Sequence, residues 1–235
     1  MSVVVDASKG DLRSVSAELK ELIIEEAVTI KESGHLHGLL AGFKGGELIV
    51  EGDSGDYLGA LNDGATIRVT GNAGRYLADN MTSGTVIVEG DAGYGAGQYC
   101  YGGTMVIRGS AGDFTGVMNK GATLIVEGDV GDEVATYMLA GDLIILGNAG
   151  ANLGNYLILG TIYIGGTWAS LGHNTLLEDG LSEADRMKLR TLFDQYGVEG
   201  DPDSLTKIVR LSERPFYKTK SAEPPEKAPL PAPLG

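Results

Sequence analysis

Glycine recurs every nineteen residues through the middle of this chain. One series steps from Gly52 to Gly166, and a second keeps the same step from Gly55 to Gly150. Two further series at other phases hold glycine or another small residue. A step kept in four registers predicts a repeat architecture, in which each unit packs on the next.

Short apolar runs lie between the glycine corners. Examples are Val86-Ile87-Val88 and Ile162-Tyr163-Ile164, in which β-branched residues dominate, as is typical of strands. Such a strand with its corners leaves no room for a helix in a nineteen-residue unit. The sequence therefore predicts an all-β parallel β-helix of about seven coils, stacked about 4.8 Å apart.

The corners repeat one pattern, Gly-x-x-Gly, whose second residue is Asp, Asn or Ser. Glycine permits positive φ, and an Asx or Ser side chain bonds its local backbone, so we expect tight structural turns. The glycines concerned are Gly52, Gly55, Gly71, Gly74, Gly90, Gly93, Gly109, Gly112, Gly128, Gly131, Gly147 and Gly150.

The ends of a solenoid need caps, because open coils expose sheet edges. An N-terminal cap is expected before the first coil, with a short helix over Glu18–Glu25. A C-terminal helix is expected to begin after Ser182 and to end at Gly197, followed by a strand over 207–211. The expected divisions are an N-terminal cap at 1–27, the β-helix at 28–168, a C-terminal helix and strand cap at 169–217, and a disordered or polyproline-like tail at 218–235.

Composition excludes several classes of protein. The formal net charge of −14 removes the attraction that nucleic-acid binding requires. No apolar run approaches the roughly 18 residues of a membrane span. A lone cysteine, Cys100, argues against a disulfide scaffold and fits a reducing compartment. We therefore expect a cytoplasmic protein that binds neither nucleic acid nor membrane.

No residue is predicted to be catalytic, to bind a cofactor or to ligate a metal. The loop Gly93–Gly97 resembles a phosphate-binding loop, but its glycines fall on the repeat phases and no helix follows. Cys100 has no neighbouring histidine in the sequence. His35 and His37 would form only half of a metal site. Each of these features is interpreted as part of a coil or corner.

The centres of the strands carry the most functional information. In a sheet with one solvent-exposed face, apolar and polar residues alternate along each strand. These strands are mostly apolar at every position, which indicates that both faces of the sheet are buried. Two covers are possible for the outer face, the helix over 183–196 or a partner protein. The candidate partner-interface residues are Ile49, Ile87, Val106, Ile125, Ile144 and Tyr163.

The repeated corners, the literal GYGAG at 93–97 and the segment 55–64 resemble the GXGXG domain. That domain occurs at the C-terminal end of the large subunit of glutamate synthase, and as separate subunits of archaeal-type glutamate synthase, N-methylglutamate synthase and formylmethanofuran dehydrogenase. The resemblance implies a right-handed β-helix without catalytic residues of its own. It implies an amidotransferase (glutaminase) subunit and an FMN and iron–sulfur synthase subunit as partners, with those cofactors held by the partners.

The leading functional expectation is thus a structural subunit of a hetero-oligomeric, glutamate synthase-like oxidoreductase complex. It would space the glutaminase and FMN subunits and seal the path that ammonia takes between them. One alternative is the β-helical subunit of a formylmethanofuran dehydrogenase or formyltransferase/hydrolase-type complex. Another is a β-helix that assembles with itself into a scaffold.

Overall fold

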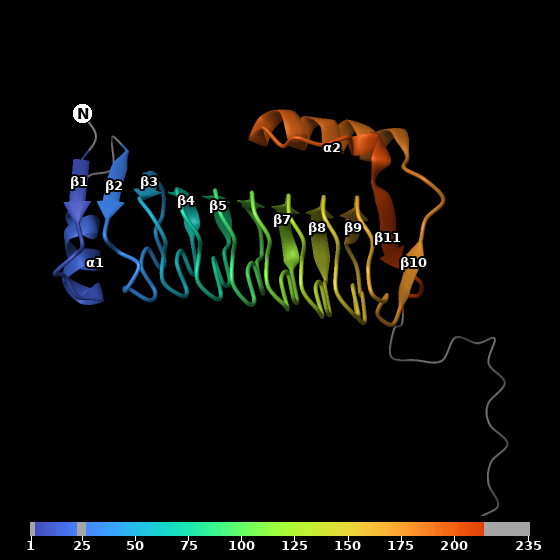
Figure 1. Ribbon diagram of the computed structural model, residues 1–235, viewed down its shortest axis with the longest axis horizontal. Helices are drawn as coiled ribbons and strands as arrows, with labels where there is room; N and C mark the ends of the chain where they lie inside the picture. Colours follow the sequence, from blue (N-terminus) through green and yellow to red (C-terminus); the bar gives the residue numbers. More distant parts are fainter. Residues whose placement is uncertain (1–2, 23–26, 214–235) are drawn as a thin grey trace, which may run out of the picture.

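The chain folds into a β-solenoid, in a computed structural model that describes residues 3–22 and 27–213 (Figure 1). One sheet of eleven strands runs along its length in the order β1-β2-β3-β4-β5-β6-β7-β8-β9-β11-β10. The strands are β1 Val3–Asp6, β2 Val28–Lys31, β3 Glu47–Val50, β4 Asp63–Val69, β5 Ser83–Val88, β6 Thr104–Ile107, β7 Lys120–Val126, β8 Ala140–Ile145, β9 Thr161–Ile164, β10 Thr175–Leu177 and β11 Thr206–Arg210.

The sheet has the parallel register that the glycine period predicts. From β3 to β9 each strand pairs with the next in parallel, so that Val86 lies beside Met105 and Met105 beside Leu124. Apart from the pairs Asp63–Ser83 and Lys120–Ala140, which are twenty apart, each pairing joins residues nineteen apart. The prediction of an all-β solenoid of about seven coils is therefore confirmed.

Two coils depart from the regular register in the same way. The pairing shifts at the start of β4 and again at the start of β7. In each coil a buried asparagine compensates, because the Asn62 side chain bonds both backbone groups of Ala65 and Asn119 does the same for Ala122. These are the coils in which one glycine comes a residue early in the sequence.

The solenoid interior is a continuous apolar core. In each strand the residues that flank the centre point inward, as Leu48 and Val50 do in β3 and Val86 and Val88 in β5, and all are essentially buried. Burying one such side chain contributes roughly 1.5–3 kcal/mol. The stacked coils thus form one cooperative core rather than separate units.

The polar residues of the corners link each coil to the next. The Asn72 N–H donates to Asp53 Oδ1 at 2.7 Å, the Asp91 N–H donates to Asn72 Oδ1 at 2.9 Å, and the Ser110 N–H donates to Asp91 Oδ1 at 2.7 Å. The same ladder continues to Thr167. The side chains therefore serve the backbone of the following coil, rather than only their own turn.

The corner glycines are needed for close packing rather than for positive φ. Of the twelve predicted turn glycines only Gly52 has a left-handed φ, of 84°. A Cβ atom on Gly109 would lie 2.8 Å from the backbone carbon of Gly90 in the preceding coil, and nearer still to Asp91 Oδ1. For the other eleven glycines the expected reason is corrected accordingly, because the stacking distance between coils leaves no space for a side chain, whereas at Gly52 a Cβ would meet nothing within 4 Å and the left-handed φ is the requirement.

Left-handed residues occur at other phases of the repeat. Gly59, Ala78 and Gly97 share one phase and all have positive φ. A second such phase, two residues later, holds larger side chains. It contains Leu61, Asn80, Tyr99, Met118, Tyr137 and Tyr156, with φ between 51° and 57°.

The ends of the solenoid differ in part from expectation. The first helix, α1 Leu12–Glu21, begins earlier than the expected Glu18, because Asp11 caps it by accepting the Ser14 N–H at 2.8 Å. The edge strands β1 and β10 were not expected. The end of the expected first helix (residues 23–25) and the tail at 218–235 lie outside the described residues.

The C-terminal helix has the predicted bounds. Helix α2 spans Glu183–Tyr196, with a capping box between Ser182 and Asp185 and a left-handed Gly197 at its end. A short 3-10 turn, η1 Pro202–Ser204, leads into β11, which pairs antiparallel with β9. In Figure 1, α2 runs along the row of strands above β6 to β9 instead of closing the end of the stack.

Candidate partner surface

The centres of the strands form one continuous row on the outer face of the sheet. The pairing places Ile49 beside Arg68, Arg68 beside Ile87, and Ile87 beside Val106. The row continues through Ile125 and Ile144 to Tyr163. All six candidate interface residues therefore lie on one face, as the sequence predicts.

Helix α2 covers the C-terminal half of this row. Val106, Ile125, Ile144 and Tyr163 are fully buried and share a second apolar cluster with the α2 residues Leu189 and Phe193. The remaining buried members of this cluster are Leu181, Val198 and Leu205. The outer face of β6 to β9 is thus filled by the chain itself.

A buried carboxylate fixes the start of α2 to the sheet. Asp185 Oδ1 accepts the Tyr163 hydroxyl at 2.6 Å, and Asp185 Oδ2 accepts both the Ser182 hydroxyl at 2.6 Å and Lys207 Nζ at 3.0 Å. Burial alone would raise the pKa of Asp185, but these hydrogen bonds outweigh it and hold the pKa well below its usual range. The same burial and the bond to Asp185 raise the pKa of the Tyr163 hydroxyl.

A cation fixes the other end of α2. The guanidinium of Arg108 on the solenoid donates to the backbone carbonyls of Tyr196 and Gly197, and it also pairs with Glu127. The last carbonyls of a helix lack partners within it and carry partial negative charge, so a cation there is stabilising. Between the two ends, Lys188 Nζ lies 2.7 Å from Asp142.

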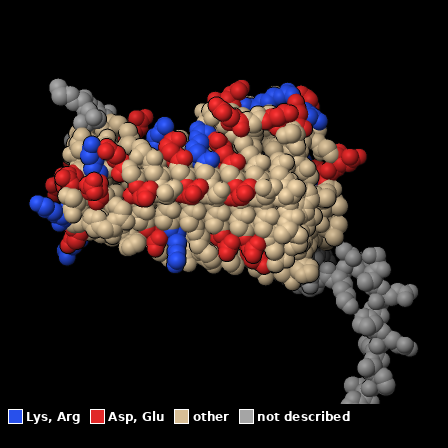
Figure 2. Space-filling model, viewed as in Figure 1, with Lys and Arg blue, Asp and Glu red and all other residues tan. Residues whose placement is uncertain are grey.

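The N-terminal half of the row is not covered by any described element. Ile49 and Ile87 are half-buried there, with Ile87 packed against the edge of the cluster under α2, and Arg68 between them is exposed. Two ion pairs lie along this half of the sheet: Arg68 of the row is 2.7 Å from Glu89, and Lys31 is 2.9 Å from Glu51. Figure 2 shows charged side chains gathered in the recess between the N-terminal end of the solenoid and α2.

The predicted partner surface is therefore corrected in extent. Val106, Ile125, Ile144 and Tyr163 lie under α2 and are not available to a partner, because the helix fills the space that a partner would occupy. Ile49 and Ile87 are each only half-buried, and Ile87 lies at the edge of the cluster under α2. Arg68, the one charged residue in the row, was the sequence signal that this half is not buried in the same way.

The residues considered for chemistry are separated by the fold. Cys100 is fully buried, and burial raises the pKa of its thiol to about 12, so the reactive thiolate does not form near neutral pH. His35 contacts the Gly10 carbonyl, whereas His37 Nδ1 accepts the Asp56 N–H. Within residues 3–22 and 27–213, no cluster of three or more metal-ligating side chains is present.

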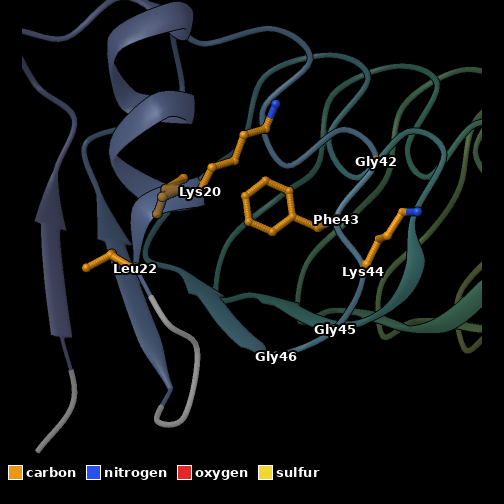
Figure 3. Close-up of a pocket in the computed structure, with 8 residues that line it drawn as sticks. Lys20, Leu22, Gly42, Phe43, Lys44, Gly45 and Gly46 are labelled. Atoms are coloured by element: carbon orange, nitrogen blue, oxygen red, sulfur yellow. The ribbon is translucent and has the colours of Figure 1, made fainter.

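A cavity of about 460 Å³ lies between α1 and the first coil (Figure 3). Phe43 lies between the side chains of Lys20 and Lys44, and glycines form much of the remaining wall. The two ammonium groups are the titratable side chains among its lining residues. Besides the two lysines, this lining offers no carboxylate, imidazole, thiol or hydroxyl side chain.

Fold and surface together define a β-solenoid protein that presents a partly covered sheet face and no assembled catalytic constellation among its described residues. The family model of the GXGXG motif matches residues 41–178, more than half of the chain, and the chain belongs to this family. The matched region contains β3 to β9 and thus the coils that carry the row of strand centres.

A solved structure shares the fold. The chain is similar to one in the X-ray crystal structure of the formyltransferase/hydrolase complex from Methylorubrum extorquens, solved with methylofuran. The two are 28% identical with a TM-score of 0.50, and the match covers 65% of this chain and 67% of the other. No curated protein matches the sequence. No helix among the described residues is long and apolar enough to cross a membrane.

Proposed function

We propose that this protein is a structural subunit of a multi-subunit complex of the formyltransferase/hydrolase type. The observation that carries the proposal is the similarity to a chain of such a complex, at 28% identity over about two thirds of both chains. The solenoid would hold catalytic subunits at a fixed spacing, as a continuous core of stacked coils is a rigid spacer.

The chemistry of the described residues favours a structural role for this chain over a catalytic one. The single thiol is buried with a raised pKa, and the two neighbouring histidines bond different backbone groups. The uncovered part of the outer face, around Ile49 and Ile87, is the surface we assign to a partner subunit. The glutamate synthase role expected from the sequence finds no support in the comparisons, which lead instead to the alternative expectation.

Purification of the tagged full-length chain from its native host tests the proposal. We expect stoichiometric co-purification of a hydrolase-type and a formyltransferase-type subunit, and neither activity nor bound flavin in the chain alone. Co-purification of a glutaminase and an FMN and iron–sulfur subunit would replace this assignment with the glutamate synthase one. A chain that purifies without any stoichiometric partner would contradict both.

A matched pair of variants locates the interface. Ile49→Glu and Ile87→Glu place a charge on the uncovered half of the row and should release the partner while the solenoid stays folded. Lys9→Glu, outside this row, serves as the control and should leave co-purification unchanged. Retention of the partner by both isoleucine variants would remove the interface from this surface.

A further inference from the structure

Two adjoining cavities form a groove between α1 and the first coil, at the N-terminal end of the solenoid. The second cavity, of about 560 Å³, shares Lys20 and Phe43 with the cavity of about 460 Å³ in Figure 3. Its other lining residues are Leu12, Arg13, Ser16, Ala17, Gly38 and Ala41. We call the two cavities together the α1 groove.

One face of α1 forms the helical wall of this groove. Arg13 and Lys20 are seven residues apart, which is about two turns, and Ser16 lies between them, so the three share one face of the helix. In Figure 3 the Lys20 side chain extends from α1 toward the coils. The acidic side chains of the same helix, Glu18 and Glu21, line neither cavity. The groove therefore receives the basic face of an otherwise mixed helix.

Every charged side chain that lines the α1 groove is basic. These side chains are Arg13, Lys20 and Lys44, and all three residues are exposed. None of them forms an ion pair with a residue that the structure describes. Elsewhere cations are commonly paired, as Lys31 is with Glu51. On a chain with a formal net charge of −14, such a gathering favours an anionic occupant.

The shape of the groove favours a peptide segment over a small molecule. A small-molecule site encloses most of the surface of its ligand. The α1 groove is more open, because Arg13, Ala17 and Ala41 along it are exposed. Nucleic acid is disfavoured, since the net negative charge of the chain repels a polyanion with one charge on every phosphate. An acidic peptide carries only a few carboxylates and needs only local charge complementarity.

We propose that the α1 groove binds an acidic, extended segment of a partner protein. Arg13 and Lys20 are separated by roughly 10 Å along the axis of α1. In a polyproline II helix every third residue lies on the same side, about 9.3 Å apart. Two carboxylates three residues apart in such a segment therefore reach both cations. Leu12 and Phe43 offer apolar surface to the residues between them.

The inference goes beyond the proposed function. The lining of the groove shares no residue with the row of strand centres, which is the surface assigned above to a partner subunit. Helix α1 also precedes residues 41–178, so the helical wall of the groove lies outside the region that the family model matches. Binding to the groove is measured on the purified full chain alone. Its failure is thus distinguishable from a failure to find the proposed complex.

Fluorescence anisotropy of a labelled peptide tests the proposal. The probe consists of three Glu-Pro-Ala repeats, and the matched control peptide consists of three Gln-Pro-Ala repeats. At low ionic strength, where charges act over about 10 Å or more, we expect saturable binding of the glutamate peptide that is about tenfold tighter than that of the glutamine peptide. In about 1 M salt, where this distance falls to about 3 Å, the difference should disappear.

Two triple variants with the same loss of charge locate the binding. Arg13→Gln/Lys20→Gln/Lys44→Gln removes the cations of the groove and should weaken binding of the glutamate peptide by about tenfold. The control variant removes three other cations, which line neither cavity and form no ion pair with described residues, and it should change binding by less than about twofold. This control is Lys9→Gln/Arg75→Gln/Lys120→Gln.

Several results would overturn the proposal. Equal weakening in the two triple variants would mean that net charge alone attracts the peptide. Equal affinity for the two peptides, or no saturable binding to the parent chain, would remove the carboxylates or the groove from the explanation. Displacement of the probe by equimolar citrate would assign the groove to a small organic anion instead. Tighter binding of a single-stranded DNA nonamer than of the probe would assign it to nucleic acid.

Discussion

The Tyr163 hydroxyl donates a hydrogen bond to Asp185 Oδ1 at 2.6 Å and so joins the last parallel strand to the first turn of α2. Both residues are buried, and the same carboxylate also accepts hydrogen bonds from the Ser182 hydroxyl and Lys207 Nζ. One side chain therefore caps the helix and attaches it to the sheet. The position of α2 over the outer face depends on this carboxylate at one end and on Arg108 at the other.

Removing the hydroxyl should weaken this attachment without disturbing the coils. Tyr163→Phe keeps the ring under α2 but takes one donor from a buried carboxylate, at a cost of about 1–3 kcal/mol. We expect a lower unfolding free energy in urea and faster proteolysis within α2. Tyr196→Phe is the control, since its hydroxyl contacts the exposed Gln195. Equal losses in both variants would contradict the role of the bond.

The attachment should also weaken in acid. The folded-state pKa of Asp185 is lowered, so its contribution to stability is complete above the unfolded pKa of about 3.9 and is lost as pH falls below it. The unfolding free energy, measured in urea from about pH 7 to pH 3, should therefore fall less steeply in Asp185→Asn than in the parent chain.

Other carboxylates contribute to the same slope, because Asp6, Asp11 and Asp203 also have lowered pKa values. The comparison must therefore be made between variants. Asp194→Asn removes an exposed carboxylate from the same helix and should keep the parent slope. Parallel curves for all three proteins would show that Asp185 is not the origin of the acid sensitivity.

The same substitution by glutamate at two positions of the row should lower the unfolding free energy by very different amounts. Ile125 is fully buried under α2, and Ile125→Glu buries an unpaired carboxylate there, at a cost of roughly 3–5 kcal/mol. Ile49 lies on the uncovered half of the row, where surface changes cost about 0.5 kcal/mol. Urea unfolding and limited proteolysis of α2 measure this difference between Ile125→Glu and Ile49→Glu. Equal stability would mean that α2 does not seal the face in solution.

The sequence predicted the solenoid because its physical signal is local and repeated. Each coil uses the same glycines and apolar positions, and the pairing of strands nineteen residues apart follows directly from that period. Helix α2 was equally predictable, since Ser182, Asp185 and Gly197 lie at its own ends. These features need no knowledge of distant contacts.

The placement of α2 was not predictable in the same way. It depends on contacts between residues far apart in the chain, such as Lys188 with Asp142 and Arg108 with Tyr196. A pattern of apolar residues on both strand faces shows that a cover exists but does not identify it. The choice between the helix and a partner therefore required coordinates, which assign the helix to one half of the row and leave the other half open.

The role of the corner glycines required coordinates for a different reason. Positive φ is a property of one residue, whereas the space for a Cβ depends on the coil below. We predict that Gly109→Ala destabilises the solenoid strongly, because its Cβ would lie 2.8 Å from the Gly90 backbone at a negative φ that alanine itself accepts. Gly34→Ala, whose Cβ would meet only the Asp53 carbonyl group, at 3.2 Å or more, should cost much less. Thermal unfolding of both variants distinguishes crowding from a turn requirement, since neither position has a left-handed φ. Comparable melting temperatures would mean that the coils can separate enough to admit a methyl group, and the close-packing explanation would fail.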